Sequence, residues 1–277
     1  MTWRLLNYRP SSAFENMAID EAIFLETIKN KKPPTLRFFG WHPAAVSIGY
    51  FQELKTEINF NQCQLSGVDI VRRITGGKAV YHQDEVTYSL TAANSEKLFP
   101  GNVSGTYERI SLCLARGLSE LGIHAHLAEG NGNVAGTKKN GSSCCFSVPS
   151  GNELLVDGRK ICGSAQMRTH GGFLQHGSLL MTFDPVATAA LILLSWASEP
   201  VEKLRRSVAA VNKVIASPVS VEVLCSVLQK GFINELGICL IEGTLTPAEK
   251  ELSTFLVKKY ESDAWNWQRK KEAFKAG

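Results

Sequence analysis

The sequence lacks several patterns that would assign it to a broad class of protein. It has no block of five like charges and no arginine-rich tract, so its formal net charge of +4 gives no specific indication of nucleic-acid binding. Its seven cysteines have no paired metal-ligand spacing, and the N-terminus has no basic-then-apolar signal pattern. These absences favour a reducing compartment. We therefore expect a cytoplasmic protein with no bound metal.

Long hydrophobic runs and internal repeats are also missing. The longest apolar run, residues 186–197, is far shorter than a bilayer requires, so we expect no membrane contact. The chain has 277 residues and 44% hydrophobic content, which is enough to bury a substantial core in one large domain, with or without a small appendage. The mildly basic balance would suit an acidic protein partner.

Capping signals and apolar periodicity predict the helices. Ser12 opens a capping box with Glu15, and Thr246 opens another with Pro247 at the first helical position. Apolar residues at helical spacing follow both caps. The predicted helices cover residues 13–29, 104–121, 186–197, 220–236 and 246–260.

β-rich runs between glycine and proline residues predict the strands. These runs cover residues 35–39, 44–48, 68–72, 86–91, 125–127 and 172–181. A further hairpin is predicted at Asp157-Gly158, because this dipeptide accepts the positive φ angles of a type I′ turn. Helices and strands in this order are compatible with a mixed α/β fold.

A glycine pair follows the run at 68–72, within the segment RRITGGKAVYH that covers residues 72–82. Gly76 and Gly77 at a strand end let the backbone approach a ligand and present N–H groups to a carboxyl, phosphate or thioester oxygen. Arg72 and Arg73 add positive charge beside them. A surface turn with solvated basic residues explains the same pattern, so the segment alone does not decide between the two.

A candidate nucleophile stands before the hairpin, in the segment CCFSVPSGNELLVDGRKICGSAQ. The hairpin would bring Lys160 near the loop that holds Cys145. A lysine ammonium beside a cysteine lowers the thiol pKa and so raises the thiolate fraction available for acyl transfer. The preceding residues, 129–143, are rich in Gly, Asn and Lys. They are consistent with a lid and equally with a disordered insertion.

Two histidines lie in predicted strands or beside the glycine pair. A lone histidine in such a position is more often a hydrogen-bonded core residue than a catalytic base. For His82 and His176 the sequence therefore favours a structural role.

Together the two segments resemble a known family. RRITGGKAVYH is similar to the R-R-x-S/T-G-G-x-x-V-x-H signature of the lipoate-protein ligase and biotin-protein ligase superfamily, and GRKICGSAQ resembles a segment of its lipoate branch. FENMAIDEA, FFGWHPAAVSIGY and KYESDAWNW extend the resemblance over nearly the whole chain. It implies an antiparallel-rich sheet flanked by helices, in a catalytic-domain fold related to that of class II aminoacyl-tRNA synthetases.

Within this superfamily the chain looks most like octanoyltransferases, because Cys145 stands directly before Phe146 and LQHGSLL matches the same branch. The resemblance implies an octanoyl-thioester on Cys145, tuned by Lys160, with no cofactor. It implies octanoyl acyl carrier protein as the donor of the octanoyl group and a lipoyl domain or glycine cleavage H protein as the acceptor. The enzyme is expected to be a monomer. The substrate-binding residues it implies are Arg72, Arg73, Thr75, Gly76, Gly77, Val80, His82, Gly163, Ser164 and Ala165.

Further expectations concern the acyl chain and the domains. Backbone N–H groups near Gly76-Gly77 or Gly163-Ser164 are candidates to bind the oxyanion. An apolar tunnel for eight carbons is expected near Val80, Tyr81, Ile70 and Leu179. The catalytic domain is expected to cover residues 1–245, with its core from about residue 31, and residues 246–277 are expected to form one helical extension.

Three alternatives stay open on sequence grounds. An ATP-dependent lipoate ligase would use the same pocket for a lipoyl-adenylate, with Lys160 at its phosphate or carbonyl. An amidotransferase would move an octanoyl group between lipoyl domains with the same cysteine. A carrier-protein-binding module would keep the pocket without chemistry.

Overall fold

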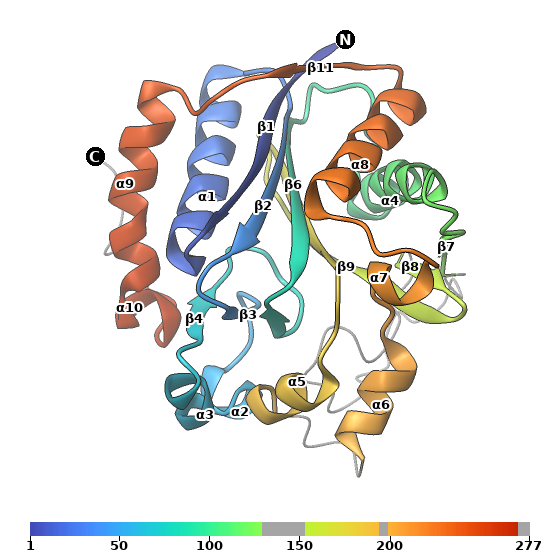
Figure 1. Cartoon of the computed structure of the whole chain (residues 1–277). Helices are drawn as coiled ribbons and strands as arrows, with labels where there is room; N and C mark the ends of the chain where they lie inside the picture. The colour runs from blue at the N-terminus through green and yellow to red at the C-terminus, as the bar shows by residue number, and fades with distance from the viewer. Residues whose placement is uncertain (129–152, 194–198, 271–277) are drawn as a thin grey trace.

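The computed structural model describes residues 1–128, 153–193 and 199–270 and contains a large mixed sheet with helices on both faces (Figure 1). Strand β1 runs parallel to β2 and β11, whereas the remaining described pairs of this sheet are antiparallel. The expected antiparallel-rich sheet is thus confirmed. In spatial order its strands are β11 (Cys239–Glu242), β1 (Thr2–Ser11), β2 (Thr35–Trp41), β6 (Glu85–Ala93), β10 (Gly172–Leu180), β9 (Arg159–Arg168), β8 (Leu154–Val156) and β7 (His126–Leu127).

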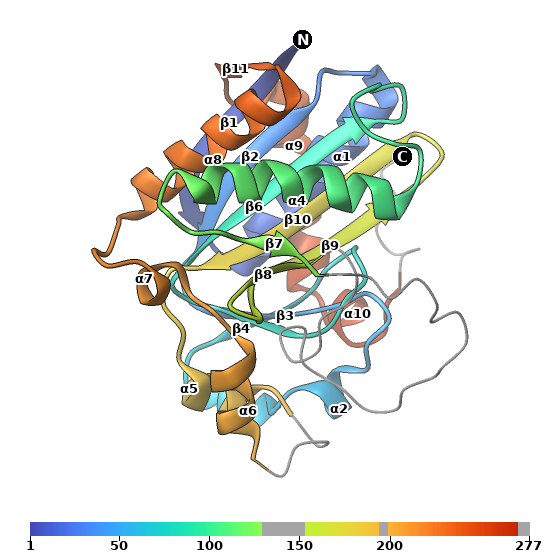
Figure 2. The same cartoon turned by 90° about the vertical axis from the view of Figure 1, so that its right-hand side faces the viewer.

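Two pairs of helices cover the large sheet, one pair on each face (Figures 1 and 2). α4 (Val103–Ser119) and α8 (Val221–Leu236) pack together over the main apolar core. α1 (Ala13–Asn30) and α9 (Pro247–Glu261) pack together on the other side, and α1 contacts β6 and β10. The short α10 (Asp263–Asn266) follows α9 and contacts β4.

A smaller sheet lies next to the large one and forms its own apolar core with short helices (Figure 1). In this sheet β3 is parallel to β4 and antiparallel to β5. The strands are β4 (Asp69–Arg72), β3 (Ala45–Ile48) and β5 (Val80–His82), and the helices are α2 (Leu54–Glu57), α3 (Phe60–Leu65), α5 (Pro185–Leu191), α6 (Pro200–Ser207) and α7 (Val211–Val214).

Strand β6 is buried along its whole length but has two chemically different faces. Its apolar side chains, Val86, Tyr88, Leu90 and Ala92, belong to the core beneath α4 and α8. The alternate positions are polar, and side chains of a strand alternate between the two faces. The polar face is therefore directed toward α1 and the small sheet, where buried polar groups need partners.

Most predicted elements are confirmed, with small shifts at their ends. The capping boxes at Ser12 and Thr246 are both present, and Asp157 and Gly158 have φ angles of 50° and 71° in the hairpin turn. The helix predicted for 186–197 is wrong in length: it ends at Leu191, because Ile192 pairs with Ile58 in a β-bridge. Strands β1 and β11 were not predicted. The loop at 129–143 lies outside the described residues.

Within the described segments, every helix falls short of the length and apolarity that crossing a bilayer requires.

Close packing of α4 against α8 depends on two glycines. A Cβ added at Gly231 would lie 2.2 Å from the Cys113 carbonyl oxygen, and one at Gly117 would lie 2.6 Å from that of Val227. We predict that Gly231→Ala forces the helices apart and lowers the free energy of unfolding by about 1–3 kcal/mol, measured by urea denaturation. The control Gly101→Ala meets nothing within 4 Å. Equal stability of the two variants would contradict this packing.

Candidate active site

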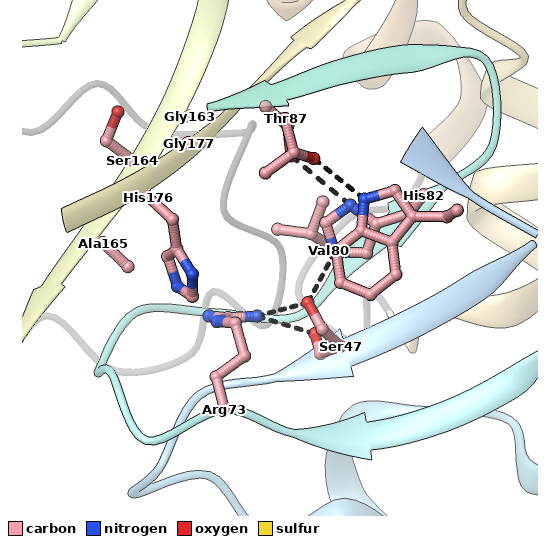
Figure 3. A pocket seen from close by; sticks show the side chains of 12 residues that line it. Ser47, Arg73, Val80, His82, Thr87, Gly163, Ser164, Ala165, His176 and Gly177 are labelled. Atoms are coloured by element: carbon pink, nitrogen blue, oxygen red, sulfur yellow. Dashed lines mark hydrogen bonds between the residues drawn. The ribbon is translucent and has the colours of Figure 1, made fainter. Parts of the chain in front are cut away.

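A narrow cavity lies between the large and small sheets and gathers residues from both sequence segments (Figure 3). We call it the central cavity. Six of the predicted substrate-binding residues line it: Arg73, Val80, His82, Gly163, Ser164 and Ala165. The other lining residues are Trp41, Ser47, Thr87, His176, Gly177 and Ser178.

Arg73 is buried and holds the glycine loop, residues 73–78, in place. Its Nη1 donates to the carbonyl oxygen of Ser47 at 2.9 Å and to the Ser47 Oγ at 2.6 Å. Its Nη2 donates to the carbonyl oxygens of Gly76 and Lys78, both at 3.0 Å. One guanidinium therefore joins Gly76 and Lys78 of the loop to Ser47 of β3, and Arg73 also lines the cavity.

The glycine loop also requires small residues at two positions. Gly77 has a φ of 92°, and a Cβ there would lie 3.2 Å from Arg73 Nη2. A Cβ at Gly49 would lie only 2.0 Å from the Gly77 carbonyl oxygen. By contrast, a Cβ at Gly76 would meet nothing within 4 Å. Gly77 therefore lies close to Gly49, directly after β3, whereas Gly76 opens outward. The close approach to a ligand expected of the glycine pair stays a prediction.

His82 is held on all sides at one end of the cavity. Its Nε2 lies 2.6 Å from Ser47 Oγ and its Nδ1 lies 2.9 Å from Glu85 Oε1. Its ring stacks on Trp41 at 3.9 Å between centroids. Burial raises the pKa of Glu85, but its contacts with His82 and Thr87 lower the pKa by more than burial raises it. The pKa of Glu85 therefore lies below its ordinary value.

His176 stands at the other end, below the glycine loop. Its Nε2 lies 2.8 Å from Thr75 Oγ1 and its Nδ1 lies 3.3 Å from Asp20 Oδ2. Burial lowers the pKa of His176 more than Asp20 raises it. Both histidines thus have hydrogen-bond partners, as the sequence favoured, and both also line the cavity.

Arg72, although predicted beside Arg73, is turned away from the central cavity. Its guanidinium donates to the carbonyl oxygens of Gly49, Gln52 and Asn266, with distances between 2.7 and 3.1 Å. Trp265 Nε1 in turn donates to the Arg72 carbonyl oxygen. Burial lowers the pKa of Arg72 to about 10. The structure therefore gives Arg72 a role in fastening α10 to the small sheet.

Lys160 is 1% exposed and forms an ion pair with Glu153. Cys145, the predicted nucleophile, and its neighbour Cys144 lie outside the described residues, and Glu153 is where the described chain resumes. Glu153 was not predicted as a site residue. The sequence could have indicated Glu153, because it lies seven residues before Lys160 in the same predicted hairpin.

Ser164 separates the central cavity from a second, very small one. Tyr88 Oη lies 2.8 Å from Ser164 Oγ, and Tyr107 Oη donates to the Ser164 carbonyl oxygen at 3.0 Å. The small cavity is lined by Tyr107, Ser111, Glu153, Leu154, Cys162 and Ser164. Glu153, the partner of Lys160, therefore lies across Ser164 from the central cavity.

Gly76 lines a wider groove of about 550 Å³ on the outside of the loop, together with Tyr50, Phe51, Gln166 and Arg168. We call it the outer groove. The glycine loop forms part of its wall and, through Arg73, part of the wall of the central cavity. The loop therefore lies between the inner and outer spaces.

Several lining residues were not predicted, and the four residues expected around the acyl chain do not line one cavity. Val80 lines the cavity, but Leu179 belongs to the main core and Ile70 packs on the small core. Tyr81 lies in a separate surface groove. The missed residues Thr87 and Ser178 had a signal: both are polar positions in strands that alternate with apolar ones.

The structure is a mixed α/β domain with a buried cavity beside its glycine loop. Residues 12–233 match the family described as the lipoyl protein ligase A/B catalytic domain. The chain belongs to this family, which confirms the resemblance found in its motifs.

Relatives extend the match to both ends of the chain. Octanoyltransferase LipM of Kyrpidia tusciae is 42% identical, covering 97% of this chain and 99% of that protein. Octanoyltransferase LipM of Bacillus subtilis is 37% identical, again covering 97% and 99%.

Among solved structures, a putative lipoate protein ligase from T. acidophilum with bound lipoic acid has a TM-score of 0.79 at 27% identity, covering 97% of this chain and 99% of that one. Lipoate-protein ligase A bound with ATP has a TM-score of 0.78 at 26% identity, covering 96% and 99%.

The buried hydrogen bonds of the Arg72 guanidinium predict a loss of stability when lysine replaces Arg72. Lysine keeps the charge but cannot reach the same carbonyl oxygens, which would remain buried and unpaired. We predict that Arg72→Lys lowers the free energy of unfolding by roughly 2–4 kcal/mol, measured by urea denaturation. The folded fraction should keep its turnover rate. A stable variant without turnover would instead indicate direct substrate contact.

The two loop glycines should differ in their tolerance of a methyl group. Gly77→Ala imposes a left-handed φ on alanine and should lower stability by about 1–2 kcal/mol. Gly76→Ala meets open space, and the φ of Gly76 lies outside the left-handed region, so the stability of this variant should be unchanged. Thermal unfolding of both variants tests this. Equal loss at both positions would contradict the loop geometry.

Proposed function

We propose that this chain transfers an octanoyl group from acyl carrier protein to a lysine of a lipoyl domain or glycine cleavage H protein. The observation that carries this proposal is the full-length similarity to octanoyltransferases, at 42% identity over 97% of the chain. We also propose that it works as a monomer in the cytoplasm. Its catalytic unit would be residues 1–245, with residues 246–277 as an extension.

The octanoyl chain would enter the central cavity, whose exposed walls are mostly apolar. Because the cavity is narrow, we expect its side chains to move apart when the chain enters. Val80 and Ala165 would contact the methylene groups, and Arg73, Thr75 and His82 would be polar neighbours of the bound acyl group.

The oxyanion would be bound by the glycine loop. Gly163 and Ser164 lie inside β9 and pair with Ser178 and Gly177 of β10. Among the described residues, no backbone partner is found for the N–H groups of Gly76 or Gly77. Two adjacent residues of a strand direct their N–H groups to opposite edges, so β10 binds only one of those of Gly163 and Ser164. The glycine loop, where neither N–H group has a backbone partner among the described residues, is therefore supported as the donor to the developing negative charge, an interaction that contributes about 3–4 kcal/mol in comparable sites.

The reaction would proceed in two acyl transfers. The Cys145 thiolate attacks the octanoyl thioester and releases the carrier thiol, which takes a proton. The ε-amine of the acceptor lysine then attacks the enzyme thioester, and the Cys145 sulfur leaves as the amide forms. The Lys160 ammonium would stabilise the thiolate and give its proton to the departing carrier thiolate, and the neutral amine of Lys160 would then accept the proton of the attacking acceptor amine. Its ion pair with Glu153 would keep its ammonium oriented.

ATP-dependent lipoate ligation is the second candidate, because the solved structures with bound lipoic acid and with ATP have the same fold at TM-scores of 0.79 and 0.78. Their identities of 27% and 26% are well below the 42% shared with an octanoyltransferase. Octanoyl transfer between lipoyl domains would use the same cysteine and the same cavity.

The first functional prediction is an octanoyl adduct formed without ATP. The protein is incubated with octanoyl acyl carrier protein and its intact mass is measured. We expect an added octanoyl group that hydroxylamine removes, because a thioester is cleaved under mild conditions. Cys145→Ser should abolish the adduct and the matched control Cys144→Ser should retain it. An adduct that requires ATP would favour the ligase, and one lost only in Cys144→Ser would overturn the assignment.

A second functional prediction tests the effect of Lys160 on the Cys145 thiol. In a protein whose other cysteines are serine, Lys160→Ala should raise the apparent pKa of Cys145 toward the free value of about 8.5, measured by pH-dependent alkylation. Lys160→Arg keeps the charge and should keep part of this effect while slowing transfer to the amine. An unchanged titration in Lys160→Ala would show that Lys160 does not act on the thiol.

A further inference from the structure

A chain of hydrogen bonds leads from the glycine loop to a carboxylate on α1. Arg73 Nε lies 3.4 Å from Thr75 Oγ1, which lies 2.8 Å from His176 Nε2. His176 Nδ1 lies 3.3 Å from Asp20 Oδ2. All four side chains are buried, so each bond is shielded from competing water.

The Asp20 carboxylate sets the order of donors and acceptors in this chain. An ionised carboxylate only accepts, so the ring hydrogen of neutral His176 lies on Nδ1 and is directed at Asp20. His176 Nε2 then accepts from the Thr75 hydroxyl, while Thr75 Oγ1 accepts from the Arg73 guanidinium, which only donates. The lowered pKa of buried His176 is consistent with this neutral tautomer.

Asp20 is itself fixed on its second oxygen. Arg37 Nη1 donates to Asp20 Oδ1 at 2.7 Å, and Arg37 Nη2 donates to Asn16 Oδ1 at 2.6 Å. Burial raises the pKa of Asp20, but Arg37 and His176 together lower it below its ordinary value. The carboxylate therefore stays ionised and can accept from His176.

We propose that Asp20 and His176 are positioning residues for the acyl transfer proposed above: they fix the hydroxyl direction of Thr75 and, with Arg73, the conformation of the glycine loop. Neither residue lies in the two segments that suggested the site. Arg73 bonds to both Gly76 and Lys78, so a change in its hydrogen bonds reaches the N–H groups that face the oxyanion.

Replacing Asp20 by asparagine would reverse the chain. Arg37 cannot accept a hydrogen bond, so the amide oxygen of Asp20→Asn must face Arg37 and the amide N–H must face His176 Nδ1. The ring hydrogen then moves to Nε2 and points at Thr75 Oγ1, which already accepts from Arg73. The hydroxyl hydrogen of Thr75 loses its acceptor, and the loop loses its fixed geometry.

Glu85→Gln is the matched control, because it also removes one buried negative charge beside a histidine. Glu85 Oε1 accepts from His82, Trp41 and Thr87, whereas Oε2 has no hydrogen-bond partner among the described residues. The glutamine oxygen can therefore stay with these donors, and the His82 tautomer does not change.

The experiment compares the full-length protein with both variants. ¹⁵N chemical shifts of labelled histidine report the tautomer of His176, and hydrogen exchange of the peptide covering residues 72–79 reports the loop. Steady-state transfer gives kcat and KM. We expect Asp20→Asn to move the His176 hydrogen from Nδ1 to Nε2, to increase loop exchange and to lower kcat by about 10²-fold with little change in KM for the acyl donor. For Glu85→Gln, kcat should fall by less than about tenfold.

Thr75→Val tests the same chain if Asp20→Asn fails to fold. It keeps the Asp20–Arg37 ion pair and the side-chain shape but removes the hydroxyl, and should increase loop exchange and lower kcat as Asp20→Asn does. Thr75→Ser should restore both. Wild-type kcat in folded Asp20→Asn or in Thr75→Val, or a His176 hydrogen found on Nε2 in the wild type, would overturn the proposal. If the wild type does not transfer octanoyl groups, the proposed function is wrong. The His176 tautomer and the hydrogen exchange of the loop would then still test whether Asp20 and His176 position the glycine loop.

Discussion

The buried guanidinium of Arg73 is the interaction on which the site depends. It joins the backbone of β3 to Gly76 and Lys78 of the glycine loop, so a single side chain holds two elements that are separated by more than twenty residues. A buried charge is unfavourable unless it is fully hydrogen-bonded. Here the hydrogen bonds that offset the cost of burying Arg73 also keep its side chain in the wall of the central cavity.

Placement of this charge follows from the large sheet. Strand β6 presents apolar side chains to the core beneath α4 and α8 and polar ones to the opposite side, where His176 and Ser178 of β10 also lie. That polar layer meets α1, which contributes Asp20, and β2, which contributes Arg37. The layer holds the carboxylates of Asp20 and Glu85 and the guanidinium groups of Arg37 and Arg73, together with neutral His176. The buried charges of the two signs are therefore equal in number. The same layer that stabilises the fold thus supplies the polar end of the cavity.

Local signals made much of the fold predictable from the sequence. The capping residues Ser12 and Thr246 and the turn at Asp157-Gly158 act over a few residues, and the elements they start are confirmed. The family was also predictable, because its motifs are contiguous. The role of Arg72 was not, since it depends on Asn266, which is far away in the sequence. Asp20 was missed for the same reason: only the packing of α1 brings it to His176.

The central claim is that the acyl chain lies in the cavity between the glycine loop, β9 and β10. The most direct test is a crystal structure of the Cys145→Ser variant with an octanoylated lipoyl domain. The account predicts the octanoyl chain beside Val80 and Ala165, with its carbonyl oxygen within hydrogen-bond distance of the Gly76 or Gly77 N–H. An octanoyl chain lying in the outer groove, with the central cavity unchanged, would contradict it.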